Sequence, residues 1–132
     1  MRLFGFRGNL GENCSMKGLD KFGAFIVQNV RDKALEQSKM LFEGRLQAKA
    51  IADLQAEIAA LPDHQKRLLA RVVRDVIDTA LHDLLFSLQD AHDRKLGIEV
   101  FVDGENVAEL SGMLNGEHLG EGGWIERFSQ YR

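Results

Sequence analysis

The sequence contains one cysteine, one proline and no long hydrophobic run. A single thiol, Cys14, cannot form an intrachain disulfide, so nothing in the sequence indicates an oxidising compartment. The longest apolar stretch, residues 23–27, is far shorter than the ~20 residues that a membrane-spanning helix needs. The N-terminal residues reach Gly8 and Asn9 before the core of a signal peptide can form. We therefore expect a cytoplasmic protein that makes no membrane contact.

The glycine-rich segment GEHLGEGGW, residues 116–124, lacks the side chains that a phosphate-binding loop requires. It has no lysine, serine or threonine to reach phosphates or Mg²⁺, and it places Glu117 and Glu121 where phosphate charge would lie. It also does not belong to the strand–helix–strand unit that carries a dinucleotide fingerprint. We therefore expect no nucleotide and no other cofactor.

A metal site in the same segment is a less favoured alternative. Glu117, His118 and Glu121 supply two carboxylates and one imidazole within five residues. Metal sites usually have three or four converging ligands, and no His-x-His, Cys-x-x-Cys or His-Glu-x-x-His spacing occurs in the chain. A solvent-exposed acidic loop is the preferred interpretation. The serines also lack the Gly-x-Ser-x-Gly context of a nucleophilic hydrolase.

Helical periodicity dominates residues 19–93. Apolar residues recur at helical spacing from about residue 19 to 43 (Ile26, Val30, Ala34, Leu41) and again from 45 to 61 (Ile51, Leu54, Ile58, Leu61). Whether Gly44 breaks one long helix stays open. Pro62 favours a new helix over about 63–93. Its broad apolar stripe consists of Leu69, Val72, Val73, Val76, Ile77, Ala80, Leu81, Leu84 and Leu88. The helix face opposite this stripe, which we expect to be solvent-exposed, carries Asp75, Asp78 and His82. We expect a local Asp78–His82 pair there.

After Lys95 the pattern changes to a hairpin of about residues 98–110, with strands 98–102 and 107–110 around an Asp103-Gly104 turn. The remainder, residues 111–132, reads as a glycine-rich loop and a short helix over about 124–130. Trp124 and Phe128 should close the core, and the role of Tyr131 stays open. We therefore predict a mostly α (α+β) fold: two or three long amphipathic helices, a small hairpin and a short terminal helix. Residues 19–132 would form one domain, preceded by an irregular arm at 1–18.

Charge is distributed unevenly along the chain. Residues 1–52 carry nine Lys/Arg and five Asp/Glu, whereas residues 53–132 carry eight and fifteen. Between Asp90 and Glu126, nine acids face only Arg94 and Lys95. Such a segment repels nucleic acid and attracts a basic protein, more strongly at low salt.

In size, charge balance and expected compartment, the chain is similar to small bacterial immunity and inhibitor proteins, which cover a basic toxin surface. The similarity is one of scale and charge, without a shared motif. We predict a non-catalytic interaction module with a basic protein partner. The expected contact residues are Asp103, Glu105, Glu109, Glu117, Glu121 and Tyr131.

Two alternatives remain beside this prediction. The first is a small metal-dependent or acid/base enzyme that uses His82 or His118 with nearby carboxylates. The second, compatible with the interaction module, is a homodimer formed through the helical stripe at residues 47–61.

Overall fold

The computed structural model describes residues 16–132, which are mostly helical with one small hairpin and a short C-terminal helix, as predicted. The expected N-terminal arm falls outside the described residues except for 16–18, and Gly18 already begins the first helix. No helix within the described part of the chain is long and apolar enough to cross a membrane.

The first helical segment is continuous but changes its pitch in the middle. It consists of α1 (Gly18–Ile26), the π-helical turn η1 (Val27–Arg31) and α2 (Asp32–Phe42), close to the predicted 19–43. A π turn inserts an extra residue and so rotates the faces that follow it. Val30, predicted to lie in the core, is consequently 45% exposed, whereas Arg31 is only 2% exposed.

Gly44 breaks the helix. Its φ of 68° is left-handed, and the amide of Arg45 donates to the carbonyl of Met40 at 2.9 Å while Gly44 donates to Leu41 at 3.2 Å. This is the hydrogen-bond pattern of a Schellman C-cap, in which glycine is preferred. The chain then forms α3 (Lys49–Ala59) and, after Pro62, α4 (Asp63–Asp93), whose bounds match the prediction.

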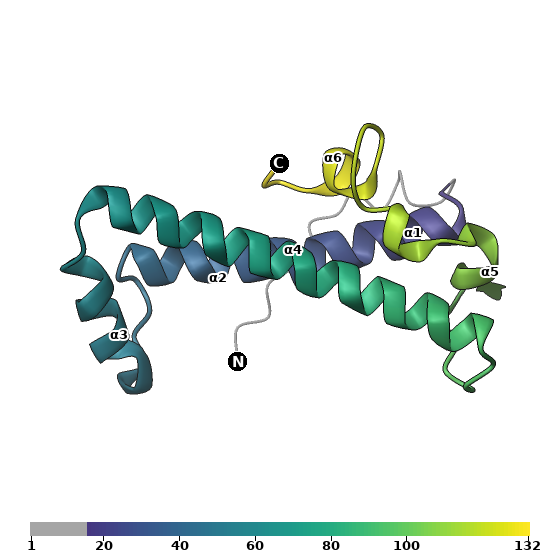
Figure 1. Ribbon diagram of the computed structural model, residues 1–132, viewed down its shortest axis with the longest axis horizontal. Coiled ribbons are helices and arrows are strands. Elements are labelled where there is room, and N and C mark those ends of the chain that lie inside the picture. The colour runs from purple at the N-terminus through teal and green to yellow at the C-terminus, as the bar shows by residue number, and fades with distance from the viewer. Residues whose placement is uncertain (1–15) are drawn as a thin grey trace.

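The long helix α4 sets the shape of the molecule (Figure 1). It runs back along α1 and α2, with α3 at one end and the hairpin and α5 at the other, so the molecule is elongated. The C-terminal helix α6 lies against the middle of this arrangement, near α1 and η1.

The hairpin is shorter than predicted. Strands β1 (Phe101–Val102) and β2 (Glu105–Asn106) pair antiparallel around the expected Asp103-Gly104 turn, in which both residues have positive φ. The predicted second strand at 107–110 is wrong, because Val107–Ser111 forms the helix α5. The side chain of Asn106 caps α5 by accepting from the amides of Ala108 and Glu109, which favours a helix at this point.

The remaining chain forms a 3₁₀ turn, η2 (Leu114–Gly116), and α6 (Trp124–Phe128). The hydrophobic core lies where α1, η1, the C-terminal half of α4, α5 and α6 meet, and it comprises Phe22, Ile26, Val27, Leu81, Leu85, Val107, Ala108, Leu114 and Trp124. Trp124 is buried edge-on against Phe22 at a ring separation of 6.1 Å, and Phe128 packs partly buried against the core, so both close the core as predicted.

Candidate functional site

The six predicted contact residues fall into two groups. Glu105, Glu109 and Glu121 are exposed. The other three are engaged within the chain: Asp103 pairs with Lys21 at 2.5 Å, Glu117 accepts from the Ser111 hydroxyl at 2.7 Å, and Tyr131 donates its hydroxyl to Glu36.

Large apolar side chains are also exposed in this C-terminal part of the chain. They are Phe86, Leu96, Ile98, Phe101, Leu110, Met113 and Leu119. Single exposed apolar residues are common, but their interleaving with exposed carboxylates is typical of protein interfaces, in which apolar contacts supply affinity and a charged rim supplies orientation. These apolar residues are not among the contact residues predicted from the sequence.

One hollow brings both kinds of residue together beside the last turns of α4. It has a volume of about 260 Å³ and is lined by Phe86, Gln89, Asp90, Asp93, Gly112, Met113 and Asn115. Both Phe86 and Met113 are more than half exposed. The volume lies just below the ~300–1,000 Å³ typical of small-ligand pockets. It suits one or two side chains of a partner better than a whole ligand.

The two carboxylates of this hollow occupy an unfavourable place for acids. Asp90 and Asp93 lie in the last turn of α4, where the helix dipole favours cations by about 0.3–1 kcal/mol. Asp90 accepts from Arg94 at 3.2 Å, and Asp93 accepts from Gln89 at 3.0 Å. Each carboxylate has further lone pairs available for a partner.

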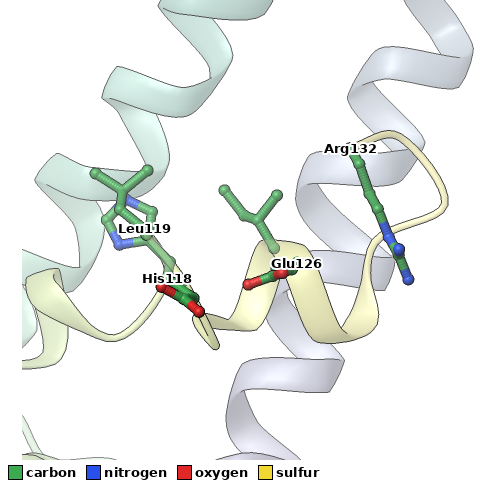
Figure 2. Close-up of a pocket in the computed structure, with 7 residues that line it drawn as sticks. His118, Leu119, Glu126 and Arg132 are labelled. Atoms are coloured by element: carbon green, nitrogen blue, oxygen red, sulfur yellow. The ribbon is translucent and has the colours of Figure 1, made fainter.

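A second hollow, of about 380 Å³, lies beside α6 and contains His118 (Figure 2). Figure 2 shows His118 and Leu119 on one side next to α4, with Glu126 on α6 and Arg132 at the opposite side. Glu121 and Ile125 also line it.

The expectation of a solvent-exposed loop is wrong for His118, which is 0% exposed. The loop folds inward because its two ends are bonded: the Trp124 amide donates to the Glu117 carbonyl at 2.9 Å, and Ile125 donates to His118 at 3.2 Å. Gly123 permits this closure, since a Cβ there would lie 2.5 Å from the Leu119 carbonyl oxygen.

The imidazole of His118 is buried beside the Asn115 backbone. Neither ring nitrogen makes a hydrogen bond of good geometry with a described residue, and the ring of His82 lies 5.8 Å away between centroids. Burial, and then the neighbouring His82, lowers the pKa of His118 below its usual value, so the ring is neutral at neutral pH. A buried polar group without a partner is destabilising.

Asp78 does not pair with His82 as expected, because Arg31 takes that carboxylate. Arg31 Nε lies 2.5 Å from Asp78 Oδ1, and His82 instead lies 3.3 Å from Asp83. Arg31 also donates to the Ser129 hydroxyl at 2.9 Å.

The buried Arg31 therefore holds the C-terminal segment against the helices. It donates to the Tyr131 carbonyl at 2.6 Å, while Asp32 accepts from Ser129 at 2.6 Å and from the Gln130 amide at 2.9 Å. This network is not predictable from the sequence pattern, because Arg31 falls outside the apolar stripe that a regular α-helix would bury.

A separate polar cluster, formed by His92, Glu99 and Asn106, joins the end of α4 to the hairpin. His92 lies 2.8 Å from Glu99, and Asn106 donates to the same carboxylate at 2.5 Å. The bond from Asn106, and then the bond from His92, lowers the pKa of Glu99. These partners fix the hairpin on α4, which is a structural role.

Within residues 16–132 no three His, Cys, Asp or Glu side chains converge as metal ligands would, so the Glu117, His118 and Glu121 alternative is not formed. His118 has no carboxylate hydrogen-bonded to its ring, and a general base must reach the proton that it abstracts. Cys14 lies outside the described residues.

Comparison with protein-family models, with characterised proteins and with solved structures finds no match to this chain.

Proposed function

We propose that the chain is a non-catalytic interaction module of the cytoplasm whose C-terminal part binds a basic protein, in the manner of an immunity or inhibitor protein. The observation that carries this proposal is the 260 Å³ hollow at the end of α4. There Asp90 and Asp93 lie beside the exposed Phe86 and Met113.

The hollow matches the chemistry of a lysine or arginine side chain. Such side chains place an apolar stem on apolar surface and keep the charged head among polar groups. Phe86 and Met113 would contact the stem, while Asp90 and Asp93 would accept from the head. Glu105, Glu109 and Glu121 would add long-range attraction, which accelerates association at low salt.

Two carboxylates at the C-terminal end of a helix weaken that helix slightly. Their presence in the lining of an exposed hollow is better explained by a role in binding than by a role in folding. The double variant Asp90→Asn/Asp93→Asn keeps the shape of both side chains and removes both charges. It should leave the fold intact, so a loss of binding would report on the charges alone.

The experiment captures proteins from the host's lysate at low and at high salt, with three forms of the chain as bait. The control Asp53→Asn/Glu57→Gln removes the same two charges from exposed positions on α3, far from the hollow. We expect the wild-type bait and the control bait each to retain one basic protein at low salt and to release it at high salt. The double variant should bind it at least about tenfold more weakly, ~1.4 kcal/mol. Equal retention by all three baits, or no retained protein, would refute the proposal.

A second candidate function is a small acid/base enzyme that uses His82 and His118. The approach of the two rings to 5.8 Å favours it, as do the ring nitrogens of His118, which make no hydrogen bond of good geometry within residues 16–132. The full burial of His118 opposes it, because substrate cannot reach the ring without movement of the loop. A stoichiometric transition metal in the untagged protein that is lost in His118→Asn would favour the enzyme over the interaction module.

A further inference from the structure

One side chain holds the loop between η2 and α6 against the rest of the molecule. Between the buried residues Leu114 and Gly123, His118 is the one buried side chain, and residues 119–122 are all exposed. The imidazole lies next to α4 (Figure 2). The closed position of residues 118–123, which we name the His118 loop, therefore depends on the burial of a single ring.

An imidazole is a weaker anchor than an apolar side chain of the same size. Both ring nitrogens of His118 are buried and make no hydrogen bond of good geometry within residues 16–132, so the ring gains little on leaving water. The ring can also take up a proton, and a charged ring is far more costly to bury than a neutral one. The loop is thus held by a side chain that titrates near neutral pH.

The groups around the ring do not favour a proton on it. On α4, His82 lies 5.8 Å away between ring centroids, and Asp78 is engaged by the buried Arg31 of η1 at 2.5 Å. Burial, then His82, and to a smaller extent Arg31 lower the pKa of His118, whereas Asp78 and the backbone of Asn115 raise it less. The charged residues that line the 380 Å³ hollow together with His118 are Glu121, Glu126 and Arg132.

The chain is anchored separately on each side of the His118 loop. Before the loop, the amide of the buried Leu114 donates to the Gln89 side chain on α4 at 3.0 Å. After it, Trp124 is buried in the core, and Arg31 binds the C-terminal segment 129–131. The loop can therefore leave α4 while both of these anchors stay in place.

Few bonds have to break for this movement. The closed loop is held by the amides of Trp124 and Ile125, which donate to the carbonyls of Glu117 and His118 at 2.9 and 3.2 Å. Glycine changes its backbone conformation more easily than other residues. Exposed glycines with positive φ lie at the tip of the loop, at Gly120 and Gly122.

We propose that His118 is an acid-sensitive latch: the His118 loop stays closed against α4 while the ring is neutral, and it opens to solvent when the ring takes up a proton. In the open loop the ring is solvated and binds a proton as the pH falls through about 6.5. In the closed loop burial lowers its pKa, so the ring stays neutral to a lower pH. The open state then holds more protons. The ratio of open to closed loop rises by up to about tenfold per pH unit below about 6.5, until the lower pKa of the closed state is reached.

The first measurement is hydrogen exchange of single amides in the full chain by NMR, at about pH 7.5, 6.5 and 5.5 and with EDTA present. Each rate is divided by the rate of an unstructured peptide at the same pH, which removes the intrinsic pH dependence of exchange. Between about pH 6.5 and 5.5, the amides of Trp124 and Ile125 should lose about three- to tenfold in protection. The amides of Leu81 and Leu85, in the buried part of α4, should keep theirs.

Three variants separate the latch from a general effect of acid. His118→Leu cannot take up a proton and should keep the protection of both loop amides at every pH. His82→Gln removes the second imidazole, which lowers the pKa of His118 in the closed state, so its loss of protection should be smaller than that of the wild type. His64→Gln, at an exposed position on α4, is the matched control and should respond as the wild type does.

An equal loss of protection at Leu81 and Leu85 would overturn the proposal, because the whole fold and not the loop would then be opening. Unchanged protection of the loop amides in the wild type, or an acid response that persists in His118→Leu, would also overturn it. The ring-nitrogen chemical shifts of His118 give a second test in the wild type. The ring should take up its proton over the pH range in which the loop amides lose protection, and protonation with the amides still protected would refute the latch. These results do not depend on binding at the hollow of Asp90 and Asp93.

Discussion

Replacement of His118 by leucine should make the protein more stable. His118 is fully buried and neither ring nitrogen makes a hydrogen bond of good geometry with residues 16–132, so folding removes two polar atoms from water with little replacement of their hydrogen bonds. An unpaired buried polar group costs about 1–3 kcal/mol. Leucine has a similar size and no polar atom. We expect His118→Leu to gain about 1–3 kcal/mol in free energy of unfolding at about pH 8, where the ring is neutral in both states.

Acidification should enlarge this difference. Burial lowers the pKa of His118 in the folded protein, whereas the unfolded chain binds a proton as the pH falls through about 6.5. The unfolded state then holds more protons, so wild-type stability is lost as the pH falls below about 6.5, by up to ~1.4 kcal/mol per pH unit, until the lower folded pKa is reached. The groups around the ring, His82, Asp78 and Arg31, remain in the variant. His118→Leu should therefore lose less stability over this range.

The assay is urea denaturation of both proteins at about pH 8, 7, 6 and 5.5. The carboxylates whose pKa is lowered, Asp20 by its bonds to Arg127 and Glu99 by its bond to Asn106, lose their contribution only near and below about pH 4.5 and do not interfere. His64→Leu, at an exposed position, is the control and should keep the wild-type acid sensitivity. A His118→Leu variant with a lower free energy of unfolding than the wild type at about pH 8 would contradict this prediction. So would a variant that loses stability on acidification as steeply as the wild type.

Three further variants test the packing. Gly23→Ala should lose about 1–3 kcal/mol in urea denaturation, because its Cβ would lie 2.3 Å from the Trp124 ring; the usual helical gain of about 1 kcal/mol on Gly→Ala would contradict this. Asn106→Ala should lose about 1 kcal/mol with faster hydrogen exchange in α5, since it removes the N-cap; unchanged exchange would argue against the cap. Arg31→Met should lose about 3–5 kcal/mol by leaving Asp78 unpaired, and Arg31→Met/Asp78→Leu should recover part of it, as a double-mutant cycle would show. An additive cycle would show that the two side chains are not coupled.

Local signals were sufficient for most of the element boundaries. Pro62 fixed the start of α4, and the Asp103-Gly104 pair formed the turn that its composition predicts. The segment assigned to the wrong type of element, Val107–Ser111, begins with a β-branched residue and contains apolar residues that also suit a strand. There the side chain of Asn106 favours the helix, because it accepts hydrogen bonds from the first amides of α5, those of Ala108 and Glu109.

The candidate site was less predictable, because the exposure of a side chain depends on its contacts with residues that are distant in the sequence. Glu117 and Glu121 are four residues apart in one loop, yet the first is bonded to Ser111 and the second is exposed. His118 was expected at the surface because its neighbours are polar. Its burial follows from the bonds that close residues 117–125, and these form only once Trp124 is docked in the core.

The sequence by itself determined the helical class, the long helix after Pro62 and the uneven charge, because periodicity and proline act through the nearest few residues. Whether Gly44 ends a helix was decided only by the structure. The tertiary structure alone decided which faces are covered. The π turn at 27–31 rotated Arg31 into the interior in place of Val30. Within the predicted apolar stripe of α4, Leu81 is buried by the described chain whereas Val72 and Val76 are exposed. A pattern of apolar residues records which side chains favour burial, but the element that buries them is set by packing between segments far apart in the chain.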